Sequence, residues 1–196
     1  MKERIDRHFA GHLAAIETVA SQLAGTIERC ALLLADSLAA GNKVLVMGNG
    51  GSAADAQHFA AELVGRFLRE RRALPAIALT TDSSILTAVG NDYGFDAVFS
   101  RQVEALAAPG DVVVGISTSG RSANVQRALE AARERGCRTV AFLGRDGGTI
   151  APLVEMPLVV PVQHTPFIQE AHATIVHILC DLVESRLFPP ASAGQN

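Results

Sequence analysis

The sequence predicts an α/β fold in which a five-stranded parallel sheet lies between helices, an α/β/α sandwich with long helices at both ends of the chain. Two observations predict it. Short apolar runs alternate with longer segments of helical periodicity. These runs are continuously apolar, which is typical of parallel strands buried on both faces. With 196 residues, 48% of them hydrophobic, the chain suits a single domain spanning residues 1–196.

The elements can be assigned in chain order. A helical pattern over residues 1–40 exceeds what one sheet needs to cover itself, so we expect these helices to serve oligomerisation. A sheet core follows over residues 43–161, with strands at 43–48, 75–79, 111–116, 138–143 and 156–161. The helices between the strands are expected at 52–69, 83–107 with a break at "GNDYGF", 122–135 and 146–152. The chain closes with a helix over 166–188, ended by "FPP", and a disordered tail over 189–196.

Charge and cysteine content exclude several function classes. A formal net charge of -3 gives no sign of a nucleic-acid-binding surface. The one basic run, residues 66–72, is interrupted by Glu70 and indicates a solvated helix end. The N-terminus lacks the apolar core of a signal peptide, and no apolar run reaches about 18 residues, so we expect a cytoplasmic protein that binds no membrane. The three cysteines are far apart and indicate reduced core thiols: Cys30, Cys137 and Cys180.

A glycine-rich loop, "GNGGS", follows the first predicted strand. In open parallel sheets, ligands bind beyond the C-terminal ends of the strands, and glycines there let a ligand approach the backbone. Ser52 suits the N-cap of the next helix, whose positive end favours an anion. The loop does not match the dinucleotide fingerprint, because Ala53 occupies the last glycine position. It therefore predicts either a tight strand-to-helix turn without a ligand or a sugar-phosphate cradle made by Asn49, Gly50, Gly51 and Ser52.

A cluster of hydroxyl groups follows the third predicted strand, in "GISTSGRSANV". One helix cap needs one hydroxyl, but four surround Gly120 between a buried strand and a helix. Hydroxyls and free backbone N–H groups at a helix N-terminus suit a phosphate dianion. We therefore predict a phosphate site formed by Ser117, Thr118, Ser119 and Ser122.

His58 and Glu62 are four residues apart and therefore lie on one face of the helix that follows the glycine-rich loop. Such a pair can ligate a metal ion or place a base beside an acid. It can equally be an ordinary surface pair. The spacing alone does not separate these readings.

Four segments together resemble a known family: "GNGGSAADAQH", "GNDYGF", "STSGRSANV" and "IQEAHATIVH". They are similar to the sugar isomerase (SIS) domain family, and within it to bacterial sedoheptulose 7-phosphate isomerases (phosphoheptose isomerases). The similarity runs over nearly the whole chain. It implies a single SIS domain that converts sedoheptulose 7-phosphate to D-glycero-D-manno-heptose 7-phosphate, a lipopolysaccharide precursor, through an enediolate. It also implies a homotetramer with sites at subunit interfaces.

The resemblance also implies roles for individual residues. Glu62 and His177 would transfer protons, and Asp92 would contact the sugar together with Asn91. The alternative role for Asp92 is purely structural, an Asx turn that caps the next helix. Zinc would be coordinated by His58, Glu62, Gln169 and His177. The last two are eight residues apart, about 12 Å along a continuous helix. Their convergence on one ion needs an irregular helix start at Gln169, side chains that reach from both ends, or two subunits. His172, three residues after Gln169, is the alternative ligand.

Other functions remain open. One relative of this family binds a replication initiator without turning over sugar, and such a non-catalytic protein is the main alternative, although the paired His58 and Glu62 favour an enzyme. A sugar-phosphate-sensing domain would need a DNA-binding segment that the sequence lacks. A dinucleotide-binding function is disfavoured, because the glycine-rich loop does not match the dinucleotide fingerprint. A Schiff-base route is disfavoured, because the only lysines are Lys2 and Lys43, the latter at the wrong end of its strand.

Overall fold

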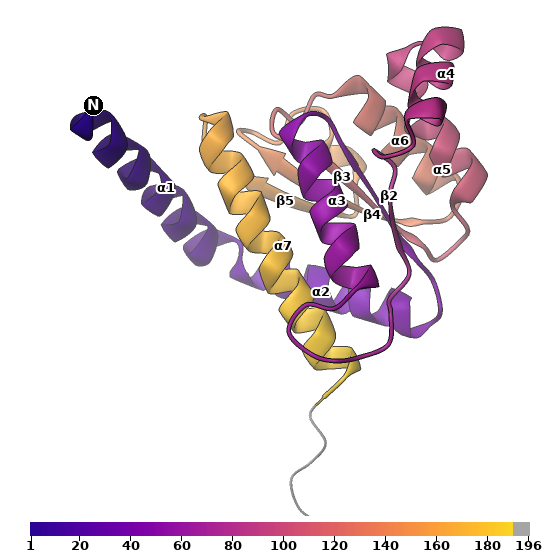
Figure 1. The fold of residues 1–196 in the computed structure, drawn as a ribbon, viewed down its shortest axis with the longest axis horizontal. Coiled ribbons are helices and arrows are strands. Elements are labelled where there is room, and N and C mark those ends of the chain that lie inside the picture. The colour runs from indigo at the N-terminus through magenta and orange to yellow at the C-terminus, as the bar shows by residue number, and fades with distance from the viewer. Residues whose placement is uncertain (190–196) are drawn as a thin grey trace, which may run out of the picture.

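The computed structural model describes residues 1–189, which contain one parallel sheet of five strands (Figure 1). The predicted fold class is confirmed, and each strand lies within two residues of its predicted bounds. The strand order is β2-β1-β3-β4-β5, and Val46 of β1 pairs with Ala78 of β2 on one side and Val114 of β3 on the other. The strands are β1 (Val44–Gly48), β2 (Ala76–Ala78), β3 (Val112–Ser117), β4 (Arg138–Gly144) and β5 (Met156–Val160).

The helices flank this sheet. The predicted segment 83–107 is broken as expected, at Gly94, where the backbone adopts a positive φ of 84°. Of the predicted tail, residues 190–196 lie outside the described part of the chain. The helices are α1 (Lys2–Gln22), α2 (Ala24–Ala39), α3 (Gly51–Val64), α4 (Ser83–Tyr93), α5 (Ser100–Leu106), α6 (Ala123–Glu134) and α7 (Thr165–Leu187), with short 3₁₀ turns at Phe95–Ala97 and Ala151–Leu153.

Two apolar cores lie on opposite faces of the sheet. Because side chains alternate along a strand, Val44 and Val46 of β1 enter one core and Leu45 and Met47 enter the other. The first core is closed by α2, α3 and α7, and the second by α5 and α6. The α1 helix extends away from this body (Figure 1), with its apolar side chains Ile5, Phe9 and Leu13 more than half exposed.

The strand order creates a switch point between β1 and β3. From β1 the chain crosses through α3 to β2 on one side, and from β3 it crosses through α6 to β4 on the other. The two crossover helices lie on opposite faces of the sheet, so the loops that follow β1 and β3 diverge and leave a crevice between them. The glycine-rich loop and the hydroxyl cluster therefore flank the place where doubly wound sheets bind ligands.

Two helix predictions need correction. The helix expected at 52–69 ends at Val64, with Gly65 after it, and residues 66–72 are irregular. The helix expected at 146–152 is wrong, because Gly147 and Gly148 adopt positive φ values of 79° and 56° and leave only a 3₁₀ turn.

The expected N-cap is also displaced. Gly50, with a φ of 57°, is the N-cap of α3, and Ser52 lies buried inside the first turn instead. A side chain at Gly50 would be strained at this φ, which explains a glycine at this position.

The cysteines and the apolar character of the helices can also be compared with the sequence. Cys30, Cys137 and Cys180 are buried and unpaired, and burial raises the pKa of Cys30 and Cys180 to about 12. None of the helices within residues 1–189 combines the length and the apolar character that a membrane span requires.

Candidate active site

Three side chains meet where α3 packs against α7. His58 and Glu62 come from α3 and His177 comes from α7. His58 Nε2 lies 3.0 Å from Glu62 Oε1 and 3.4 Å from His177 Nε2. The two imidazole rings meet edge to face, with centroids 5.0 Å apart. One donor atom from each residue lies within 4.8 Å of the other two, so we call these three residues the triad.

The packing of the two helices brings the triad together. Figure 1 shows α3 and α7 running side by side with their N-termini at the same edge of the sheet. His58 and Glu62 occupy successive turns of α3 and so present one face to α7. All three side chains remain at least partly accessible. Two imidazole nitrogens and one carboxylate are a donor set that suits zinc, and three such ligands leave a further coordination position to be filled.

Gln169 lies two turns before His177 on α7, which is regular from Thr165 onward. An irregular helix start at Gln169 is therefore excluded. Its amide packs against Gly51 at the start of α3, because a Cβ at Gly51 would lie only 2.3 Å from Gln169 Nε2. Gln169 thus faces the glycine-rich loop, at the substrate end of the same helix pair that carries the triad.

His172 is not a metal ligand, and that alternative is wrong. The side chain is fully buried, and its Nε2–H donates to the carbonyl of Leu143 at 3.1 Å. Its ring packs near Phe142, with centroids 5.9 Å apart. Burial lowers the pKa of His172 to about 4, so it is a neutral core residue near pH 7.

The two ligand loops are joined by a reciprocal amide pair. Asn49 Nδ2 donates to Asn124 Oδ1, and Asn124 Nδ2 donates to Asn49 Oδ1, both at 2.9 Å. Asn124 also accepts a hydrogen bond from the N–H of Val125 and is buried. The pair fixes the loop after β1 against the start of α6. Sequence analysis missed Asn124, whose side chain gives no local signal of a partner 75 residues away.

The predicted hydroxyl cluster forms at the N-terminus of α6. Ser117 Oγ lies 2.8 Å from Ser122 Oγ and 3.5 Å from Ser119 Oγ. Ser122 is the N-cap of α6, yet its hydroxyl makes no capping bond to the helix. Gly120 has a φ of 65°, and a Cβ there would lie 2.2 Å from the Gly147 carbonyl, so only glycine fits. Asn124 Oδ1 takes the N–H of Val125, but Ser122 leaves the start of α6 without a hydroxyl cap, which suits an anion there.

The charge nearest this cluster is already neutralised. Arg121 donates from Nη1 and Nη2 to both carboxylate oxygens of Asp146, at 3.0 and 2.8 Å. The hydrogen bonds from Arg121 hold the pKa of Asp146 well below its ordinary range. The cluster therefore offers an anion neutral donors rather than a free guanidinium.

Asn91 and Asp92 are not joined to the triad by any contact among the described residues. Both lie exposed in the last turn of α4, where Asn91 Nδ2 donates to Asp92 Oδ1 at 2.8 Å. Asp92 does not cap the following helix, because it lies inside α4 and Gly94 separates it from the next turn. No residue of α4 is buried in this single chain.

The comparison with known proteins places this geometry in a family. The SIS domain model matches residues 8–144, more than half of the chain. This chain belongs to the SIS domain family. Within the SIS family, the phosphoheptose isomerase of Geobacter sulfurreducens (strain ATCC 51573 / DSM 12127 / PCA) is 71% identical over 174 residues, which cover 89% of this chain and 92% of that protein.

Solved structures of SIS proteins agree with the fold. A phosphoheptose isomerase from Neisseria gonorrhoeae superimposes with a TM-score of 0.90 at 49% identity, covering 94% of this chain and 98% of that one. A phosphoheptose isomerase from Francisella tularensis gives a TM-score of 0.91 at 39% identity, covering 93% and 97%. These comparisons confirm the predicted resemblance of this chain to phosphoheptose isomerases.

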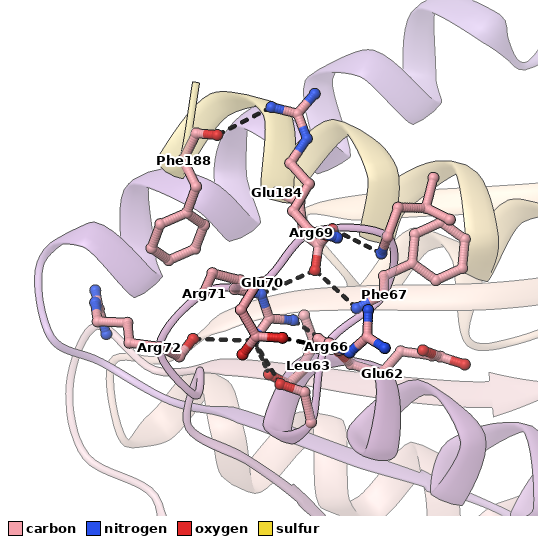
Figure 2. Close-up of polar contacts among 12 residues, drawn as sticks. Glu62, Leu63, Arg66, Phe67, Arg69, Glu70, Arg71, Arg72, Glu184 and Phe188 are labelled. Atoms are coloured by element: carbon pink, nitrogen blue, oxygen red, sulfur yellow. Dashed lines mark hydrogen bonds and ion pairs between the residues drawn. The ribbon is translucent and has the colours of Figure 1, made fainter. Parts of the chain in front are cut away.

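The structure of the basic run at residues 66–72 differs from the sequence prediction, which also missed the partners of Arg69 and Arg71. It is no solvated helix end, because the Arg71 side chain is 1% exposed and pairs with Glu184 of α7 at 2.9 Å (Figure 2). Arg69 donates to the Ser185 hydroxyl and the Phe188 carbonyl. An arginine in a charged segment gives no sequence signal of a buried carboxylate 113 residues away.

Proposed function

We propose that this chain, like its named relatives, is a phosphoheptose isomerase that converts sedoheptulose 7-phosphate to D-glycero-D-manno-heptose 7-phosphate through an enediolate. Two observations carry the proposal: the triad of His58, Glu62 and His177 on the helices α3 and α7, and the hydroxyl cluster at the N-terminus of α6. An isomerase needs such a pairing, because one end of the substrate must be anchored while the other exchanges protons.

The phosphate binds the hydroxyl cluster. The hydroxyls of Ser117, Thr118, Ser119 and Ser122 and the N-terminal N–H groups of α6 donate to its oxygens. The backbone of Asn49, Gly50, Gly51 and Ser52, held to α6 by the Asn49–Asn124 pair, lies along the sugar chain. Gln169 of α7, whose amide packs against Gly51 at the start of α3, contacts the sugar as well.

Glu62 and His177 move the protons. Moving the carbonyl from C2 to C1 requires removal of a proton from C1 and return of one to C2, which a single carboxylate can do. Glu62 presents Oε1 to His58, which leaves its other oxygen for that proton. His177 exchanges the protons of the substrate oxygens as general acid and base. Asn91 and Asp92 bind sugar hydroxyls once a neighbouring subunit brings α4 toward a site.

The residues present fit a zinc ion. His58, Glu62 and His177 supply the ligand atoms. Gln169, whose amide packs against Gly51 in this chain, is the fourth protein ligand that we propose. When bound, zinc supplies positive charge that stabilises the negative oxygens of the enediolate. A neutral amide ligand makes the site one of modest affinity, as suits a catalytic rather than a structural metal.

We also propose a homotetramer in the cytoplasm. An apolar pocket of about 190 Å³ lies between α1, α2 and α7, lined among others by Val19, Ile27 and Ile178. The exposed apolar side chains of α1 and the lack of any buried residue in α4 give further surface for subunits to cover. The three reduced cysteines support a reducing compartment.

The proposal is tested with purified protein and sedoheptulose 7-phosphate, following the appearance of the aldose. Unphosphorylated sedoheptulose is the substrate control. Glu62→Gln keeps the shape but loses the base, so its rate is expected to fall by roughly 100-fold or more. Binding of the sugar phosphate without any turnover would instead support the non-catalytic alternative, which the intact triad does not favour.

A further inference from the structure

Glu184 is the centre of a buried network that the proposed reaction does not use (Figure 2). Its side chain is 1% exposed, as is that of its partner Arg71, whose Nε donates to Oε1 at 2.9 Å. The backbone N–H groups of Phe67, Leu68 and Arg69 donate to the same carboxylate at 2.7, 2.9 and 3.0 Å. Burial by itself would raise the pKa of Glu184, but these donors hold it below its ordinary range. The pair is therefore charged at neutral pH.

The rest of the Arg71 guanidinium caps the end of α3. Nη2 donates to the carbonyl of Glu62 at 2.8 Å, and Nη1 donates to the carbonyls of Leu63 and Gly65 at 2.8 and 3.1 Å. These carbonyls belong to the end of a helix, where intrahelical partners run out and a positive charge is favourable. Arg71 thus holds the backbone of the residue whose side chain joins the triad.

Glu184 lies seven residues after His177, which is two turns further along the same face of α7. The Glu184–Arg71 pair therefore ties this face of α7 to the C-terminal end of α3. His177 stands on one of the tied helices and Glu62 on the other. The distance between these two members of the triad depends on how closely the helices are held.

Phe67 provides a second connection to the triad. Its N–H donates to Glu184, and its ring stacks on the imidazole of His177, with centroids 5.6 Å apart and planes inclined by 25°. Because Glu184 accepts a hydrogen bond from the backbone N–H of Phe67, it also helps to position the Phe67 ring. Phe67 follows the C-terminal end of α3, so its ring restricts the orientation of the His177 imidazole from that end of the helix.

We propose that the Glu184–Arg71 pair is a positioning device for the triad, which fixes α3 against α7 and seats Phe67 on His177. Because buried ion pairs add little net stability over apolar residues of similar size, the role assigned to this pair is geometric. Groups that orient metal ligands without touching the metal typically change affinity by about 10- to 100-fold. The inference deepens the proposed function and rests on it for the role of the triad.

The first test measures zinc affinity by titration calorimetry, at a temperature where each variant is folded. Glu184→Gln removes the charge and presents an amide to the N–H donors, so zinc affinity is expected to fall by about 10- to 100-fold. Asp111→Asn is the matched control. Asp111 is also a buried carboxylate that accepts from backbone N–H groups, of Lys43 and Ala108, and from the Lys43 ammonium, but it precedes β3 and none of these partners belongs to α3 or α7. It is expected to lower the melting temperature while leaving zinc affinity within about twofold.

The second test keeps the ion pair intact. Phe67→Leu removes only the stack on His177, so zinc affinity is expected to fall by about 2- to 10-fold while the protein stays folded. In the metal-free proteins, nuclear Overhauser effects between the Phe67 and His177 rings report directly whether the two rings are in contact. These are expected in the wild type and in Asp111→Asn, and they are expected to weaken or vanish in Glu184→Gln.

Three outcomes would overturn the inference. Folded Glu184→Gln could retain both the ring contacts and full zinc affinity, Phe67→Leu could bind zinc as the wild type does, or Asp111→Asn could lose as much affinity as Glu184→Gln. If Glu184→Gln does not fold, the zinc affinity of Phe67→Leu alone tests whether the Phe67 ring positions His177. A wild type that does not isomerise sedoheptulose 7-phosphate refutes the proposed function, whereas the ring contacts in the metal-free protein still test the positioning.

Discussion

His58 and His177 lie 119 residues apart in the sequence, yet their Nε2 atoms are 3.4 Å apart in the fold. Two ring nitrogens this close, with Glu62 Oε1 3.0 Å from one of them, repel once both imidazoles are protonated and attract a shared cation. One ligand atom from each of the three residues lies within 4.8 Å of the other two, as a metal site requires. This relationship motivates the first prediction.

Removal of metal is expected to abolish most of the isomerase activity, and stoichiometric zinc is expected to restore it. His58→Ala removes one ligand and should weaken zinc binding by about 100-fold or more, beyond the effect of an orienting group. Zinc should also raise the melting temperature of the wild type, because it binds only the folded site. Calorimetric titration and thermal denaturation measure both effects.

The control for this prediction is His8→Ala. His8 lies on α1, where its Nε2 is 3.1 Å from Glu170 Oε1, outside the triad. It should bind zinc as the wild type does. Equal loss of affinity in the two histidine variants would remove the triad as the metal site.

The phosphate is expected to depend on hydroxyls and not on an arginine. A Ser119→Ala, Ser122→Ala double variant should lose on the order of 1–3 kcal/mol of binding free energy for the phosphorylated sugar. Ser100→Ala, which removes a hydroxyl that donates to the Ala97 carbonyl, is the control. Binding measured by calorimetry on Glu62→Gln protein avoids turnover during the titration. Unchanged affinity in the double variant would place the phosphate elsewhere.

His172 is expected to make the protein less stable as the pH falls from about 6.5 to about 4. Burial lowers the pKa of His172 from 6.5 to about 4, so over this range the unfolded chain binds a proton that the folded chain does not. The accumulated loss is about 3 kcal/mol of unfolding free energy. His172→Gln keeps a donor for the Leu143 carbonyl and does not titrate.

Urea unfolding of wild type and His172→Gln, at one fixed protein concentration, measures this difference. The gap between the two unfolding free energies should change across pH 6.5 to 4 and stay constant above pH 7. A gap that does not vary with pH would mean that His172 becomes protonated without unfolding.

Self-association is expected to bury the apolar groove between α1, α2 and α7. Ile178→Glu places a charge in this groove and should shift the protein from a tetramer to smaller species in sedimentation or light scattering. Leu106→Glu, at an exposed position at the end of α5, is the control. A wild type that is monomeric at working concentration would end the proposal of a tetramer.

Mixed tetramers test which residues act within one chain. Because Glu62 and His177 meet inside a single chain, mixing Glu62→Gln with His177→Asn subunits under exchange conditions is expected to restore no activity. By contrast, if Asp92 acts in a neighbour's site, mixing Glu62→Gln with Asp92→Asn should recover part of the rate. Activity from the first mixture would assign the two triad residues to sites formed across subunits.

The sequence by itself determined the elements and the chemistry at their ends. Runs of continuous apolar residues are typical of parallel strands, and this pattern located all five of them, including β2, which is only partly covered in this chain. The hydroxyls from Ser117 to Ser122 and the His58–Glu62 spacing depend on residues within one or two turns. Local patterns carry such information because backbone geometry relates near neighbours directly.

Only the tertiary structure decided which of these ends meet. The order β2-β1-β3-β4-β5 sets the loops after β1 and β3 side by side, and nothing in either strand specifies its neighbour, because any apolar strand can pair with another. The packing of α3 against α7 brought His177 to the triad. It also turned Arg71, which reads as an exposed charge, into the buried partner of Glu184, since the energy of a charge depends on a partner that the local sequence does not contain.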